Sequence, residues 1–347
     1  MMSAPLARPK RVPLWDNARF VAITLVVIGH AILKLIAESD TAYGVYLFIY
    51  AFHVPVFVAV AGYFAKADAP GPKQLKRIVT DLVLPYLIFE AIWSVIQSLL
   101  DGRPRVDFAN PSWTLWFLLA LIVWRVALPY LALLRYPLLI SVVISVAAGY
   151  LPGIGGVFAL DRTLALLPFF VLGWKLRQLP WTAIWLAASQ RTVWLIRAAS
   201  IALFAALALV IATNVPLWRE VKLRRVLLFQ EAYPEFGYDQ WWAGALRLGA
   251  IVLAGLLVLA FLTLMPRRAT WFSPLGQATL YVYLLHTFVL YPIRQSGMLD
   301  GPQSDLLHVG MILFSILLTL ALSTTLVRRV FRPLVEPRAE WLFARRP

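Results

Sequence analysis

Long apolar runs, separated by short clusters of charged and turn-forming residues, constrain this chain more than any other feature. A helix needs about 20 apolar residues to cross the hydrocarbon core of a bilayer, and about ten runs of this kind occur. Hydrophobic residues make up 61% of the 347 residues, against roughly 45–50% in soluble proteins. The sequence therefore predicts an all-α, polytopic membrane protein with about ten transmembrane helices. The predicted spans are 18–37, 45–65, 81–100, 113–134, 138–151, 163–176, 193–212, 242–264, 271–292 and 306–327.

Two of these spans leave the count open. Spans 138–151 and 163–176 are short and are interrupted by Pro152, Gly153 and Pro168. Broken or re-entrant helices of this kind occur in membrane proteins where they line a cavity. Totals of nine or eleven spans therefore remain open.

The distribution of Lys and Arg predicts the orientation. If the N-terminus is cytoplasmic, 21 of the 32 Lys and Arg residues lie in inner segments and 8 in outer segments. Cytoplasmic loops carry an excess of these residues, so we expect both termini to be cytoplasmic, with basic tails at 1–17 and 328–347. We expect residues 1–347 to form a single domain in the plasma membrane, without an appended soluble domain.

Composition also excludes several functions. The net charge of +15 does not indicate nucleic-acid binding, because the basic residues form small clusters between apolar spans rather than one face. The chain has no Cys, which excludes disulfides and thiolate chemistry. No metal-binding His spacing, Walker motif, G-x-S-x-G motif or dinucleotide fingerprint occurs. We therefore expect neither a bound metal nor these nucleotide-binding or hydrolase chemistries.

The first span carries three polar residues on one face. Arg19 and His30 are eleven positions apart, which is roughly three helical turns and about 16 Å along the axis. Asp16 falls on nearly the same face. Because a helix that only anchors a protein in lipid would not carry such a stripe, we interpret this face as lining a cavity or contacting other helices.

Three of the four histidines are predicted to reach the same depth. Counting at about 1.5 Å per residue from the span ends places His30, His53 and His286 near the bilayer midplane, whereas His308 lies near a span end. A neutral imidazole away from water could act as a general base toward a hydroxyl that attacks an activated acyl group. His53 could be a second base, a proton relay or an orienting group. The alternative, favoured for His286, is a histidine that only hydrogen-bonds a backbone carbonyl.

Basic residues near the start of the first span suggest an anion site. Arg19, together with Lys66, Lys73, Lys76 and Arg77 of the next inner loop, could bind phosphates. The alternative for the loop residues is ordinary positive-inside anchoring.

Two further charges lie within predicted spans. Arg125 and Glu90 are both too deep to reach water easily, so they could form a structural ion pair. Trp113 and Trp116 are also typical of the aromatic belt at a membrane interface.

Four motifs follow one another along the chain. They are an Arg, ten residues and a His (Arg19 to His30), F-H-V-P-V-F-V-A-V-A-G-Y (52–63), W-T-L-W-F-L-L-A-L (113–121) and L-G-Q-A-T-L-Y-V-Y-L-L-H (275–286). Together they resemble the acyltransferase 3 family of integral-membrane O-acyltransferases. The opening motif is most similar to the subgroup of fucose 4-O-acetylases and related sugar acetyltransferases. Ala61 and Thr279 stand where that family often has Ser.

The resemblance implies a bundle of about ten helices that takes acetyl, or another short acyl group, from acyl-CoA at the cytoplasmic side. The acceptor would be a hydroxyl of a cell-envelope carbohydrate or glycolipid, entering from the outer side near loop 213–241. Many relatives carry a C-terminal hydrolase-like domain; without one, the chain is expected to complete transfer alone or with a separate partner.

The resemblance also assigns residues. Arg19 and His30 carry over as the essential pair and His53 as a further site residue, with Trp116 and His286 from the later motifs. The resemblance does not extend to the other candidates. From their position near Arg19, Asp16, Lys76 and Arg77 are expected to help bind the nucleotide, and the buried charges Arg125 and Glu90 are expected to support the site.

A secondary transporter is the alternative function. In that case the intramembrane His, Glu and Arg side chains would relay protons or substrate. Transporters commonly show an inverted internal repeat, and we detect none in this sequence. A purely structural scaffold is disfavoured by the titratable groups gathered at one depth.

Overall fold

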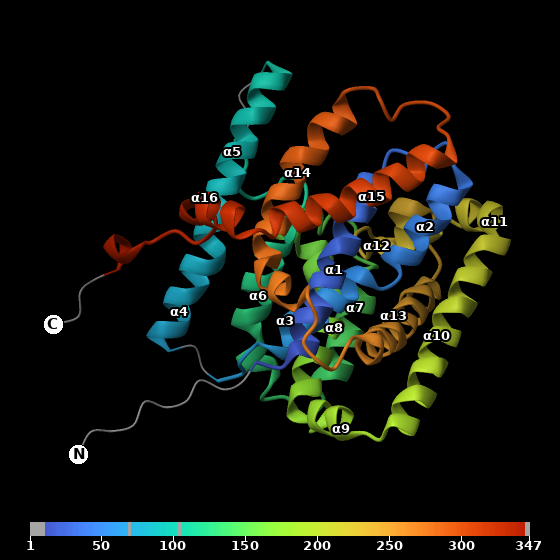
Figure 1. Ribbon diagram of the computed structural model, residues 1–347, viewed down its shortest axis with the longest axis horizontal. Coiled ribbons are helices and arrows are strands. Elements are labelled where there is room, and N and C mark those ends of the chain that lie inside the picture. The colour runs from blue at the N-terminus through green and yellow to red at the C-terminus, as the bar shows by residue number, and fades with distance from the viewer. Residues whose placement is uncertain (1–10, 69–70, 103–105, 344–347) are drawn as a thin grey trace.

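The computed structural model describes residues 11–68, 71–102 and 106–343, which form helices and connecting turns without any strand among them (Figure 1). The predicted all-α class is thus confirmed. Some of the basic residues that entered the orientation argument lie outside the described residues: Arg8, Lys10, Arg103, Arg105, Arg345 and Arg346.

In the described part of the chain, sixteen α-helices make up the fold. They are α1 (Pro13–Ala31), α2 (Asp40–Tyr50), α3 (His53–Tyr63), α4 (Pro72–Ile78), α5 (Leu84–Asp101), α6 (Trp116–Leu131), α7 (Pro137–Ala148), α8 (Leu160–Gln178), α9 (Trp181–Ala187), α10 (Gln190–Thr213), α11 (Val215–Glu220), α12 (Leu223–Leu228), α13 (Ala243–Leu264), α14 (Thr279–Gln295), α15 (Asp305–Leu322) and α16 (Thr325–Val335). A π-helical turn joins α4 to α5, and a 3₁₀ segment precedes α14.

Among the described residues, six helical segments are long and apolar enough to cross a membrane. They are Asp40–Tyr63, Pro72–Asp101, Val157–Gln178, Gln190–Thr213, Ala243–Leu264 and Asp305–Leu322. Two shorter apolar helices, α6 and α7, occupy the predicted fourth and fifth spans. The structure therefore supports a multi-pass membrane protein, while the total of ten spans and the cytoplasmic termini stay predictions.

Two predicted spans end or break earlier than expected. The first helix ends at Ala31, after which residues 32–38 form turns. The second span divides into α2 and α3 at Ala51 and Phe52. Pro55 explains this break, because proline has no N–H to donate to the carbonyl four residues earlier and its ring crowds that carbonyl.

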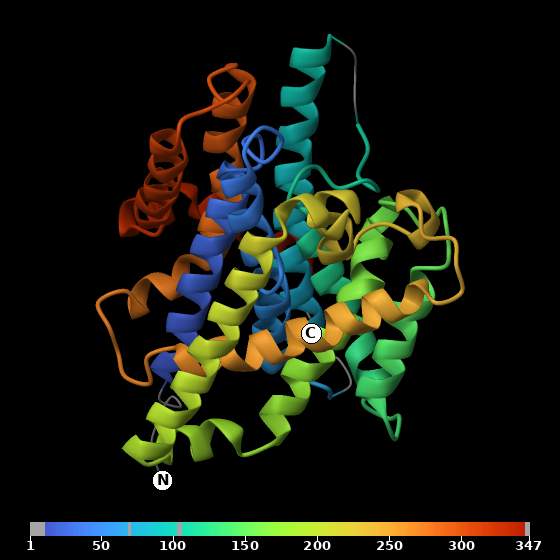
Figure 2. The ribbon, with the colours of Figure 1, turned by 90° about the vertical axis from the view of Figure 1, so that its right-hand side faces the viewer.

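Helix α10 runs along the outside of the bundle, across α13 (Figure 2). Only 11% of its most apolar stretch of 18 residues is buried, and Trp194, Leu195 and Leu209 are among its exposed side chains. An apolar helix that is exposed in this way suits contact with lipid tails rather than water.

The centre of the bundle is formed where α3 packs against α8. A Cβ atom added at Gly62 would lie 2.0 Å from the carbonyl oxygen of Phe170, and one at Gly173 would lie 1.8 Å from that of Ala59. Only glycine allows the two backbones to approach so closely. This contact supports α1, which packs against α3, α14 and α15.

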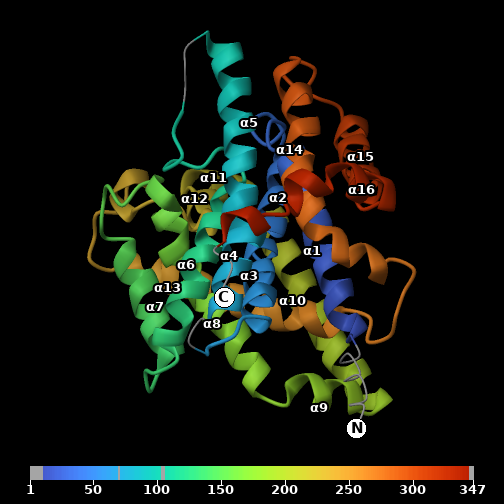
Figure 3. The same cartoon turned by 90° about the vertical axis from the view of Figure 1, so that its left-hand side faces the viewer.

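The molecule has two ends, which we name by residues on them. The Arg19 end contains the start of α1 and α9; the Arg294 end contains the ends of α5 and α14 (Figure 3). Helices α1 and α14 run in the same direction between these ends. Beyond α1, Lys34 forms an ion pair of 2.6 Å with Asp300, which follows α14.

Candidate functional site

A cavity of about 240 Å³ lies in the middle of the bundle, and we call it the central cavity. His30 from α1 and His53 from α3 line it, together with Trp116 at the start of α6. The remaining walls are largely aromatic and aliphatic. His286 lies directly behind His30 and has no exposed surface. The structure thus brings together the three histidines that were predicted to share one depth.

His30 and His286 form a directed hydrogen-bond chain. Nδ1 of His286 lies 2.9 Å from the carbonyl oxygen of Val282, and because a carbonyl can only accept, this nitrogen carries the proton. In a neutral ring the Nε2 atom of His286 is then an acceptor. It lies 2.9 Å from Nδ1 of His30, which therefore donates. The Nε2 atom of His30 is left unprotonated and available as a base.

His53 has the same tautomer for the same reason. Its Nδ1 atom donates to the carbonyl oxygen of Ile49 at 2.8 Å, across the break between α2 and α3. Its ring stands edge-on to Tyr50, with 4.4 Å between the ring centroids. These contacts hold a second unprotonated Nε2 atom in place beside the cavity.

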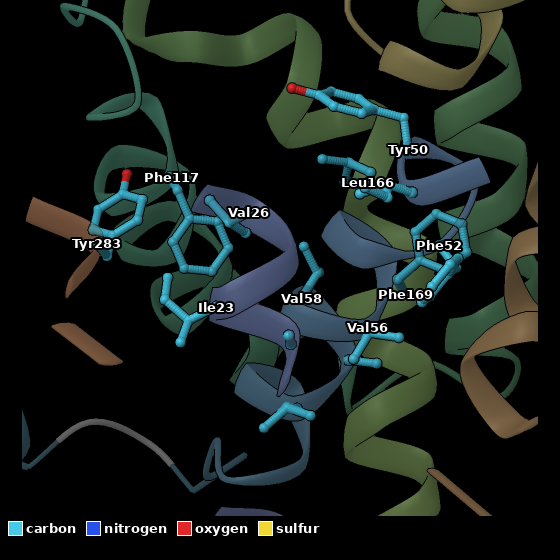
Figure 4. Close-up of a cluster of buried hydrophobic side chains, with 14 of the residues drawn as sticks. Ile23, Val26, Tyr50, Phe52, Val56, Val58, Phe117, Leu166, Phe169 and Tyr283 are labelled. Carbon is cyan, nitrogen blue, oxygen red and sulfur yellow. The ribbon is translucent and has the colours of Figure 1, made fainter. Parts of the chain in front are cut away.

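A second cavity of about 250 Å³, the Arg19 cavity, lies on the Arg19 side of the central one. Arg19 and Arg125 line it. The two cavities share the side chains of Phe57, Phe117 and Tyr283. Figure 4 shows the rings of Phe117 and Tyr283 beside side chains of α1. These three rings therefore form the partition between the basic cavity and the histidines.

A third cavity of about 510 Å³ continues from the Arg19 cavity, with which it shares Arg125. Lys73 and Arg77 line this third cavity, together with Lys66. Lys76 is directed elsewhere, since its ammonium nitrogen lies 4.8 Å from the centre of the Phe343 ring. The structure thus places Arg77, but not Lys76, beside the Arg19 cavity.

Two contacts hold the Arg19 guanidinium. One is an ion pair of 3.6 Å with Asp16, and the other is the Phe64 ring, whose centroid lies 4.2 Å away. Asp16 is largely buried, with 8% of its surface exposed. Asp16 therefore positions Arg19, which leaves the guanidinium at the cavity wall.

Glu90 and Arg125, which were expected as a pair, have different neighbours. Glu90 accepts hydrogen bonds from the backbone N–H of Ser112 at 2.8 Å and from its hydroxyl at 2.6 Å. Ser112 immediately precedes Trp113, whose φ of 51° lies in the left-handed region. Glu90 therefore holds the loop that carries the tryptophans, while Arg125 lines the two basic cavities.

Three arginines were not predicted as site residues. Arg162, Arg224 and Arg294 all line the central cavity at its Arg294 end. They come from α8, α12 and α14, and sequence analysis counted them only as charges of outer segments. No local signal in the chain could have drawn attention to them, because each guanidinium lies over an aromatic ring that is distant in the sequence.

Comparison with known proteins matches nearly the whole chain to one family. The model of a family described as an acyltransferase domain matches residues 13–328. The nodulation protein NolL of Mesorhizobium japonicum (strain LMG 29417 / CECT 9101 / MAFF 303099) is 29% identical over 105 residues, which is 28% of this chain and 28% of NolL. The match thus covers less than a third of that relative. No solved structure matches the chain.

Proposed function

The chain belongs to the acyltransferase 3 family, and from this premise we propose that it transfers an acetyl or other short acyl group from acyl-CoA to a hydroxyl of a cell-envelope carbohydrate or glycolipid. Family membership supports membrane acyltransferase activity. The observation that carries the finer proposal is the hydrogen bond of 2.9 Å between His30 and His286. It leaves Nε2 of His30 unprotonated, and His30 lines the central cavity, which adjoins the basic Arg19 cavity.

The two basic cavities suit an anionic donor. Arg19, Arg125, Lys73 and Arg77 line them, and Asp81 is the acidic residue in their walls. Guanidinium and ammonium groups of this kind bind phosphates. Acyl-CoA would supply an activated thioester. We therefore propose that its phosphates bind at the Arg19 end, and that this end faces the cytoplasm.

His30 would act as the general base. Its Nε2 atom takes the proton of the acceptor hydroxyl while the oxygen forms a bond to the acyl carbon and the carbon–sulfur bond breaks toward sulfur. The imidazolium then returns this proton to the sulfur, so that His30 ends neutral. His286 stabilises the imidazolium through the bond that it already accepts. His53 would orient the acceptor by accepting a hydrogen bond from a second hydroxyl.

We further propose that residues 1–347 act as one domain of the plasma membrane with both termini cytoplasmic. The transporter alternative loses support because the family match spans residues 13–328, which include all three central histidines.

Acetyl-CoA binding tests the proposal. Purified protein in detergent should bind acetyl-CoA, and Arg19→Gln should weaken binding on the order of tenfold or more, as expected for the loss of a charge-assisted bond. The control is Arg191→Gln, an exposed arginine at the start of α10, which should bind like the wild type. A wild-type protein that neither binds nor turns over acetyl-CoA would refute the transferase proposal and turn attention to transport.

A further inference from the structure

The three arginines of the central cavity outnumber the carboxylates near them: Asp161 interacts with the adjacent Arg162 but does not line the cavity. Arg162, Arg224 and Arg294 come from three separate helices. Among the described residues that line this cavity, none is Asp or Glu. Burying several cations with fewer counter-charges is unfavourable, so this arrangement points to an anion that the cavity receives from outside.

Aromatic rings hold the three guanidinium groups in place. The Arg162 guanidinium carbon lies 4.8 Å from the centre of the Trp116 ring, and that of Arg294 lies 4.9 Å from the centre of the Trp113 ring. Arg224 lies over Tyr46 at 5.5 Å. Stacking of this kind orients a guanidinium and leaves its edge free to donate hydrogen bonds.

Some of these donors have no partner within the described chain. The Nε atom of Arg224 is buried and makes no hydrogen bond. Buried polar groups are normally satisfied, and an exception calls for an explanation. Arg162 donates to the side-chain oxygen of Gln230 through one terminal nitrogen, which satisfies only part of its donor set. A carboxylate or phosphate oxygen would satisfy the remaining donors.

The cluster lies on the far side of His30 from the donor cavity. Along α14, Thr279 lines the Arg19 cavity, Tyr283 belongs to both cavities, and Arg294 lines the central one. The eight residues from His286 to Arg294 span about 12 Å. An anion at the cluster would therefore belong to the molecule that approaches His30 from the Arg294 end.

We propose that the arginine cluster binds a carboxylate or phosphate of the acceptor, so that the acceptor is an acidic carbohydrate. This inference rests on the proposed transferase function for its link to the reaction, but the anion site itself can be tested without it. The cluster would select charge, while Trp113 and Trp116 contact the faces of the sugar ring.

Binding to the purified protein without acyl-CoA tests the site, with titration calorimetry as the readout. The probes are methyl β-D-glucuronide for a carboxylate, glucose 1-phosphate for a sugar phosphate, inorganic phosphate for a free anion and methyl β-D-glucoside as the neutral sugar. We expect one of the two charged sugars to bind on the order of tenfold or more tightly than the neutral sugar and inorganic phosphate. The preferred charged sugar identifies the anionic group.

Variants then assign the binding to the cluster. Arg162→Gln and Arg294→Gln should remove the preference for the charged sugar, and Arg294→Lys should retain part of it. The control is Arg225→Gln, which removes the same charge from the next position of α12, where Arg225 pairs with Glu231 at 2.9 Å. Melting temperatures in detergent identify any variant that is unfolded. If a glutamine variant is unfolded, the sugar preference of Arg294→Lys is compared with that of the wild type instead.

Three outcomes would overturn the inference. The first is equal binding of neutral and charged sugars, and the second is binding of inorganic phosphate as tight as that of the sugar phosphate. The third is a loss of acetyl-CoA affinity in the arginine variants with the sugar preference unchanged, which would assign the cluster to the donor. Tight binding of a charged sugar by a protein that ignores acetyl-CoA would support the anion site and refute the proposed transferase.

Discussion

Replacing His286 by leucine should slow acyl transfer without weakening donor binding. His286 accepts the Nδ1 proton of His30 at 2.9 Å and has no exposed surface. In His286→Leu that N–H loses its acceptor. The imidazole of His30 can then turn, or carry its proton on Nε2 instead of Nδ1, and in either case Nε2 no longer serves as the base. An unsatisfied buried donor costs about 1–3 kcal/mol, which corresponds to roughly 5- to 150-fold in rate. We expect kcat to fall by this factor and the KM for acetyl-CoA to stay unchanged.

His286→Gln is the matched control. Its amide oxygen can accept from His30 while its amide nitrogen donates to the carbonyl of Val282, so kcat should stay closer to that of the wild type. Release of CoA can be followed with a thiol reagent, because the chain contains no cysteine and the protein adds no background. Equal activity of the two variants, both folded, would refute the argument, as would wild-type kcat in His286→Leu.

Two further predictions concern the framework of the site. Gly62→Ala should lower the stability in detergent by about 1–3 kcal/mol, because the added carbon meets the carbonyl of Phe170 at 2.0 Å. The control is Gly255→Ala, which has no neighbour within 4 Å and should keep the wild-type stability. Equal melting temperatures of the two variants would contradict this prediction. Glu90→Leu should lower turnover and melting temperature together, because Ser112 loses both hydrogen bonds, and a fully active, equally stable variant would show that Glu90 does not hold the loop.

The relations between residues that depend on the geometry of a single helix could be predicted from the sequence. Helical periodicity placed Arg19 and His30 on one face, and in the structure each lines one of two adjoining cavities. Counting residues from span ends also placed His53 and His286 at the depth of His30. Both arguments need only the helical rise per residue and the thickness of a bilayer.

The same reasoning failed where the direction of a side chain around its helix decides the partner. Glu90 and Arg125 were both recognised as buried charges, but depth alone does not determine which neighbouring helix each one faces. Glu90 bonds to Ser112, which follows it by 22 residues.

The arginine cluster shows a second limit of sequence reasoning. Arg162, Arg224 and Arg294 lie on three helices that meet only through tertiary packing. In the sequence each is one of the eight basic residues of the outer segments. These residues entered only the comparison of inner with outer charges, which suggests no site.

The most direct test of the account is turnover of acetyl-CoA by His30→Ala, measured beside His308→Ala. His308 lies on α15 next to Asp305, at 3.3 Å, and controls for the loss of a histidine elsewhere. General-base catalysis contributes on the order of 10²- to 10⁴-fold. We expect His30→Ala to lose at least about 100-fold in turnover while it still binds acetyl-CoA, and His308→Ala to behave like the wild type. A folded His30→Ala protein with wild-type turnover would contradict this expectation.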